Sequence, residues 1–241
     1  MKTLTEDTYK ANGERRIILI SHSMGALMTT HFLQEQTQQW KDKHIAAHIS
    51  LGGAYGGTIK AVKLYTIGDD VGVYVISSLK QREVQMTWSG VAYLMPSPLV
   101  FKPDEPFVEA FNKKFTVANI PDLFANLSCP DCFDMWNDTE PFNQNRFAHP
   151  GVDVYCLYGR GVDTVEKLIQ NRDQKPGPPL ILYGEGDGTV NLQSLQVCLR
   201  WNDTRSHKFF NHEYPHTNHQ QIMTDPKIIQ DIFAIIDQIE K

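Results

Sequence analysis

A serine lies at the centre of the segment SHSMG at residues 21–25, directly after a short apolar run. Small residues two positions before and after a serine allow a sharp strand-to-helix turn that projects its hydroxyl above a parallel sheet. The helix that follows directs its first amides to the same point. Ser23 is therefore the candidate nucleophile for acyl transfer, and the Met24 amide is the candidate first donor of an oxyanion hole. The alternative is an ordinary strand-to-helix turn.

Such a serine needs a histidine base and a carboxylate that orients the base. In serine hydrolases whose nucleophile lies in a turn of this kind, the acid precedes the histidine in the chain. The segment GEGDGTV at residues 184–190 follows an apolar run and places Asp187 between glycines, which permit a tight loop. It lacks the alternating acidic ligands of an EF-hand calcium loop. Asp187 is the candidate acid, and a surface turn is the alternative.

Four histidines follow the candidate acid, namely His207, His212, His216 and His219. A catalytic histidine of this fold lies in a loop just ahead of the last helix, and both His216 and His219 satisfy that condition. His207 and His212 lie on either side of a predicted strand at residues 208–210. The residues by themselves leave His216 and His219 as equal candidates for the base.

The elements that must position these residues form an α/β core with a mostly parallel sheet. Short apolar runs predict strands buried on both faces, and they lie at residues 17–20, 45–51, 152–158 and 180–183. The segment 1–14 is predicted to be the end of a helix, closed by Asn12-Gly13. Further helices are predicted over 26–39 and from Asp225-Pro226 onward. The last one carries an apolar face of Ile228, Ile232, Ile235, Ile236 and Ile239.

Between residues 67 and 150 prolines and aromatic residues are frequent and the periodicity is broken. Such a stretch is unusual inside a compact sheet domain and is typical of a cap or lid insertion. We therefore predict three parts: residues 1–66 with the nucleophile turn, residues 67–150 as a cap or lid, and residues 151–241 as the C-terminal part of the core.

The chain has 241 residues, of which 41% are hydrophobic and 21% charged, with a formal net charge of -5 at pH 7. This composition is that of an ordinary globular protein, and the charge argues against a nucleic-acid partner. No window approaches the roughly 18 apolar residues of a transmembrane helix, and the N-terminus lacks the apolar centre of a signal peptide. We expect neither a metal nor a cofactor.

Glycosylation sequons occur at Asn126, Asn137 and Asn202, and the chain has an even number of cysteines. Together they favour a lysosomal or secreted protein whose signal peptide is absent from this chain, and the alternative is a cytosolic protein with buried thiols. Cys129 and Cys132 form a lone C-x-x-C motif. We favour a small loop disulfide there over a redox pair or half of a metal site.

Several longer segments resemble one family. ILISHSMGALMTTHFL resembles a nucleophile strand and helix, WKDKHIAAHISLGGAYGGTIKA the segment after it, and IGDDVGVYVISSLKQREVQ with LMPSPLVF a lid. GVDVYCLYGRGV and GEGDGTVNLQSLQVC resemble the segments that hold the acid. All of them resemble the lecithin–cholesterol acyltransferase family, and the motif GDGTVNL is closest to its lysosomal phospholipase A2 branch (group XV).

The resemblance implies an α/β-hydrolase fold with Ser23 as nucleophile, Asp187 as acid and His219, the last residue of YPHTNH, as base. It also implies a Cys156–Cys198 disulfide. The activity it implies is release or transfer of a glycerophospholipid acyl chain through an acyl-serine, with water or a lipid alcohol as acceptor. The implied partner is a phospholipid membrane or a lipoprotein surface.

Two alternatives remain for the function: a sterol or diacylglycerol acyltransferase of the same family, and a non-catalytic lipid-binding relic.

Family members have a long stretch before the nucleophile strand, which holds the first sheet strands and the second oxyanion donor. We therefore expect the chain to be a fragment or the product of a truncated gene model, lacking the N-terminal part of the fold and inactive or poorly folded alone. The lid residues either line an acyl route or pack the cap, and they are Trp88, Tyr93, Leu94, Met95 and Phe101.

Overall fold

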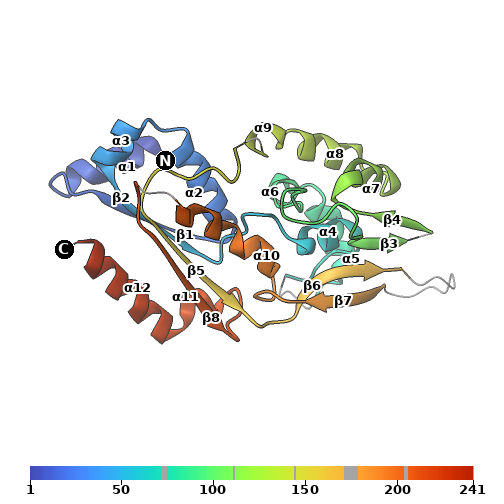
Figure 1. Cartoon of the computed structure of the whole chain (residues 1–241). Helices are drawn as coiled ribbons and strands as arrows, with labels where there is room; N and C mark the ends of the chain where they lie inside the picture. The colour runs from blue at the N-terminus through green and yellow to red at the C-terminus, as the bar shows by residue number, and fades with distance from the viewer. Residues whose placement is uncertain (72–74, 111, 144, 171–178, 204–205, 241) are drawn as a thin grey trace. The chain divides into compact units, whose positions relative to one another are not determined.

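The computed structural model describes residues 1–71, 75–110, 112–143, 145–170, 179–203 and 206–240 (Figure 1). The chain divides into two compact units, each with its own four-stranded sheet. The first unit consists of Met1–Tyr55, Asn145–Val162 and Leu195–Lys241, and the second of Gly56–Gln144 and Asp163–Ser194.

These divisions differ from the predicted boundaries at 66/67 and 150/151. The largest difference is the segment 163–194, which the sequence predicts to be part of the C-terminal core and which lies in the second unit. The reason is strand pairing: β6 (Thr164–Ile169) pairs with β3 (Val108–Ala110) and β7 (Leu180–Gly184), and not with the parallel sheet of the first unit.

The sheet of the first unit is fully parallel, with the strand order β1-β2-β5-β8. Its strands are β1 (Ile17–His22), β2 (Ile45–Leu51), β5 (Val154–Arg160) and β8 (Phe209–Pro215). The strands predicted at 17–20, 45–51 and 152–158 are confirmed, with β2 matching at both ends. Burial on both faces is correct for β2 but wrong for β1, whose Ile20 is 50% exposed.

The helices of the first unit lie on both sides of this sheet (Figure 1). They are α1 (Lys2–Ala11), α2 (Met24–Gln34), α3 (Gln38–His44), η2 (Gln196–Asp203), α11 (Gln221–Thr224) and α12 (Pro226–Ile239). The single helix predicted over 26–39 is two helices, because the Thr37 side chain accepts from the Trp40 amide and begins a new one. The last helix begins as predicted after Asp225, whose side chain accepts from the Lys227 amide.

The apolar face of α12 covers the centre of the parallel sheet. Ile228 and Ile235 pack with Ile49 and Leu51 of β2 and with Leu157 of β5, and all five are buried. Ile18 of β1 also packs against this cluster, whereas Ile20 of the same strand is half exposed.

The sheet of the second unit has the strand order β4-β3-β6-β7, where β4 is Lys113–Phe115. Only the β3–β6 pair is parallel. Its helices are α4 (Ile59–Thr66), α5 (Ser78–Gln85), α6 (Ser89–Tyr93), η1 (Val117–Asn119), α7 (Ile120–Asn126), α8 (Pro130–Asn137) and α9 (Glu140–Asn143), and α10 (Leu192–Leu195) begins in it.

The strand predicted at 180–183 exists as β7, but the prediction that it is a buried strand of the parallel core was wrong. β7 is the last strand of the second sheet and pairs antiparallel with β6. Leu180 is 60% exposed and Tyr183 55%. A short apolar run does not itself specify which sheet it joins or how many of its faces are covered.

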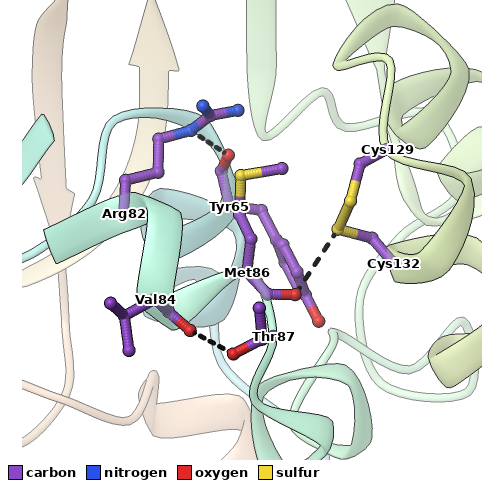
Figure 2. Close-up of a disulfide and its surroundings, with 7 residues drawn as sticks. All are labelled: Tyr65, Arg82, Val84, Met86, Thr87, Cys129 and Cys132. Carbon is purple, nitrogen blue, oxygen red and sulfur yellow. Dashed lines mark hydrogen bonds between the residues drawn. A yellow bond between two sulfur atoms is a disulfide. The ribbon is translucent and has the colours of Figure 1, made fainter. Parts of the chain in front are cut away.

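Both predicted cysteine pairs form disulfides. Cys156 of β5 bridges to Cys198 of η2, and both are buried in the first unit. Figure 2 shows the second disulfide, Cys129–Cys132, where Cys132 lies fully buried with its sulfur 3.7 Å from the Met86 carbonyl oxygen. Within the described part of the chain, no helix has the length and apolarity to cross a bilayer.

Candidate active site

Ser23 occupies the turn between β1 and α2 in a strained backbone conformation, with φ 58° and ψ −127°. Residues with a Cβ rarely adopt a positive φ, and such strain persists only where the surroundings impose it. The Ser23 amide donates to the Leu51 carbonyl oxygen at 3.0 Å, and the Ala54 amide donates to the Ser23 carbonyl oxygen at 3.4 Å. The end of β2 thus holds the turn that projects the serine.

The hydroxyl of Ser23 contacts a histidine from a distant part of the chain. Ser23 Oγ lies 2.8 Å from Nε2 of His219, which is only 6% exposed and sits between β8 and α11. This distance is that of a hydrogen bond through which an imidazole can remove the serine proton.

The loop that carries His219 is held from two directions. Asn218 Oδ1 accepts from the amides of Gln220 at 3.0 Å and Gln221 at 2.9 Å. On the other side the loop packs closely on β5, since a Cβ at Gly159 would collide with the Thr217 carbonyl oxygen. The position of the imidazole therefore depends on a glycine that is distant in sequence.

The other candidate histidines lie elsewhere in the first unit. His216 is exposed in the same loop, with a left-handed φ of 55°. His212 belongs to β8 and its ring contacts Tyr214, whereas the ring of His207 stacks on that of His149. The structure thus brings one of the four histidines within hydrogen-bond distance of Ser23.

Asp187 lies in the second unit, in the loop after β7, and is 1% exposed. Its Oδ1 accepts from the amides of Thr189 at 3.0 Å and Val190 at 2.8 Å. The next amide in the loop, that of Gly188, donates to Thr164 Oγ1 at 2.8 Å. These bonds fix the direction of the carboxylate.

Two further residues that sequence reasoning missed support this loop. Thr58 Oγ1 donates to the Thr189 carbonyl oxygen at 2.6 Å. Asn191 accepts from the Ile59 amide at 3.0 Å and donates to the Val165 carbonyl oxygen at 2.9 Å. Both lie in segments that resemble the family, but nothing in their spacing relates one to the other.

Met24 is the first residue of α2. No carbonyl within the helix accepts from the first four amides of an α-helix, so the amide of Met24 has no partner within α2. The turn at residues 21–25, called the nucleophile elbow below, is thus followed directly by a helix N-terminus, as the sequence predicts.

Two histidines that sequence reasoning missed, His48 and His22, form hydrogen bonds next to the nucleophile. Ser21 Oγ lies 2.7 Å from Nε2 of His48, a fully buried residue of β2 whose pKa is lowered to about 4 by burial. His22 Nε2 lies 2.9 Å from the carbonyl oxygen of His219. Among the described residues, no group of three or more histidine, cysteine or acidic side chains could hold a metal ion.

The parallel sheet, the strained serine between strand and helix, and its bond to a histidine define the α/β-hydrolase class of fold. A chain in the crystal structure of the Tle4–Tli4 complex has the same fold, with a TM-score of 0.66 at 13% identity over 98% of this chain and 63% of that chain.

A sequence profile of the lecithin:cholesterol acyltransferase family matches residues 1–149 and 139–229, and the chain therefore belongs to that family. The family predicted from the sequence is confirmed. The phosphatidylcholine-sterol acyltransferase of Gallus gallus is 34% identical over 86% of this chain and 50% of its own length. The lysosomal phospholipase A and acyltransferase of Homo sapiens is 33% identical over 93% of this chain and 54% of its own length. The chain thus spans about half the length of these curated relatives.

Proposed function

We propose that the protein releases or transfers the fatty acyl chain of glycerophospholipids through an acyl intermediate on Ser23. The observation that carries the proposal is the 2.8 Å contact between Ser23 Oγ and His219 Nε2 at a strained strand-to-helix turn. The names of the relatives, a sterol acyltransferase and a phospholipase A and acyltransferase, support a lipid ester as substrate.

The reaction has two steps. His219 Nε2 takes the proton of Ser23 while Oγ attacks the ester carbonyl, and the amide of Met24 donates to the resulting oxyanion. The tetrahedral intermediate then collapses, the ester C–O bond breaks, and the imidazolium returns the proton to the departing lysophospholipid. In the second step water or a lipid alcohol attacks the acyl-serine, again with His219 as base, and the serine is regenerated.

Asp187 is the acid in this proposal. A carboxylate in that role keeps the imidazole in the correct tautomer and stabilises its charged form, without itself taking the proton. The burial of Asp187 and the two amides on Oδ1 support the role, because both hold the carboxylate in one orientation.

The acceptor separates the main function from its runner-up. Water as acceptor gives a phospholipase, whereas a sterol or a diacylglycerol gives an acyltransferase. The relatives with the two kinds of name are 34% and 33% identical to this chain, so similarity alone favours neither acceptor. Product analysis decides: labelled phosphatidylcholine yields free fatty acid in the first case, and a labelled ester that needs the added alcohol in the second.

We also propose that the protein works at a lipid surface, in the lysosome or outside the cell. Exposed apolar side chains of the second unit support the surface, and they are Val75, Ile76, Leu79, Val84 and Trp88. Both disulfides support an oxidising compartment. The three sequon asparagines are exposed, as glycan attachment requires: Asn126, Asn137 and Asn202.

A fluorophosphonate probe tests the nucleophile directly. We expect the longest available transcript product that contains this chain to be labelled at one site, labelling to disappear in Ser23→Ala, and labelling to persist in the control Ser206→Ala, which changes an exposed serine. If that product is folded and the probe does not label it, the result would contradict the enzyme and favour the lipid-binding relic.

A further inference from the structure

His22, the residue directly before the proposed nucleophile, contacts the proposed base. It ends β1, and its Nε2 lies 2.9 Å from the carbonyl oxygen of His219. The two rings are also in contact, with centroids 4.5 Å apart at an interplanar angle of 44°. A carbonyl oxygen only accepts hydrogen bonds, so Nε2 of His22 carries the proton and donates it.

Two consecutive residues of the elbow therefore hold the same residue at two points. Ser23 Oγ bonds to the ring of His219, and His22 bonds to its main chain. The partners are 196 and 197 residues apart in sequence, so these contacts cross-link two remote segments. The end of β1 is itself held in the sheet, because His22 pairs in register with Leu51 of the neighbouring strand β2.

We propose that His22 is a positioning residue that sets the distance between the base and the nucleophile. The inference rests on the proposed function, since it assigns His22 to the same Ser23–His219 pair. Through its hydrogen bond to the main chain, His22 opposes movement of the loop away from β1, and its ring limits rotation of the His219 imidazole.

The expected effect follows from geometry. Displacing a catalytic group by about 1 Å lowers a rate by roughly 100-fold. Without the His22 donor, the contacts described above that remain on this loop are those of Asn218, Gly159 and Ser23. We therefore expect the acylation rate to fall and substrate binding to change little, because His22 acts through His219.

Three substitutions separate the hydrogen bond from the ring. His22→Leu removes the donor. His22→Gln places an amide nitrogen as many bonds from Cα as Nε2 of histidine, whereas the amide of His22→Asn is one bond too short. The exposed His212 of β8 provides a matched control, His212→Leu.

The readouts are the rate of fluorophosphonate labelling, kcat and KM on a soluble p-nitrophenyl ester, and the thermal midpoint. We expect His22→Leu and His22→Asn to lose about 10- to 100-fold in labelling rate and kcat with KM nearly unchanged. His22→Gln should recover most of that loss, and His212→Leu should match the parent.

The outcomes distinguish this inference from the proposed function. If the parent is labelled at Ser23 and His22→Leu reacts at the parental rate, the positioning role is wrong and the function stands. If His22→Gln is as slow as His22→Leu at equal thermal midpoint, the hydrogen bond is not what matters and the inference fails. A folded parent that is not labelled at Ser23 overturns both.

Discussion

Ser21 Oγ lies 2.7 Å from Nε2 of His48, which links β1 to β2 two residues before the nucleophile. His48 is fully buried, and no partner among the described residues reaches its Nδ1. Burial lowers the pKa of His48 to about 4, so the ring is neutral at physiological pH. Ser21, which occupies the first small position of the elbow, therefore also satisfies a buried polar atom.

We predict that Ser21→Ala lowers the free energy of unfolding by about 1–3 kcal/mol, because it leaves Nε2 of His48 buried without a partner. Urea unfolding measures the change. In a His48→Leu background the same substitution should cost much less, since the orphaned nitrogen is gone. Equal costs in both backgrounds would show that the Ser21–His48 bond contributes nothing to stability.

Stability should depend on pH through His48. Its pKa is about 4 in the folded chain and about 6.5 when unfolded, so between these values only the unfolded state binds the proton. The stabilisation is complete above pH 6.5 and falls as the pH drops toward 4, by up to roughly 3 kcal/mol. Unfolding titrations across this range should show a shallower slope for His48→Leu.

A second contribution of the same sign is expected from His149, whose pKa is lowered to about 4 by burial and by the neighbouring His207. Some slope should therefore remain in His48→Leu. A parental slope in His48→Leu would refute the assignment.

Gly159→Ala should impair acylation more than stability. The added Cβ would collide with the carbonyl oxygen of Thr217, two residues before His219, and displace the loop that carries the base. We expect the fluorophosphonate labelling rate to fall by about 100-fold. The control is Gly13→Ala, where a left-handed φ of 65° makes alanine costly but a Cβ meets nothing within 4 Å. Labelling as fast in Gly159→Ala as in the parent would contradict this account.

The two disulfides should differ in their effect on stability. Cys156 and Cys198 are 42 residues apart, and Cys129 and Cys132 are 3 apart. Because a longer loop loses more entropy on closure, replacing the first pair by serine should cost about 4 kcal/mol and the second about 2 kcal/mol. Chemical unfolding of the two double variants measures the difference. The reverse order would show that packing around Cys132, not loop closure, dominates.

The proposed lipid surface can be tested with phosphatidylcholine vesicles. Val75 is 92% exposed and Leu79 is 67% exposed, so changing both to serine removes apolar contacts without disturbing a core. We expect vesicle co-sedimentation to weaken by about tenfold or more. A double change at Leu4, which is 72% exposed, and Phe233, at 62%, is the matched control. Equal weakening in both double variants would argue against a specific lipid-binding surface at residues 75–79.

The features that the sequence alone determined are those encoded by contiguous residues. A strand, a small-residue turn and a helix in succession are sufficient to identify the elbow, and Ser23 takes the strained conformation that this pattern requires. The run at 45–51 is wholly compatible with a strand buried on both faces, and β2 has those bounds. Asp225 and Pro226 begin the last helix by local capping, and no distant residue is needed to predict it.

Only the tertiary structure decided which remote residues meet. Local spacing left His216 and His219 equivalent, and the 2.8 Å contact with Ser23 depends on a loop position set by Gly159 and Asn218. The apolar run of β7 did not reveal its sheet, because strand pairing is a choice between distant partners with similar patterns. The roles of His22 and His48 were invisible for the same reason: a histidine's chemistry depends on what lies within hydrogen-bond distance, and those atoms come from other strands and loops.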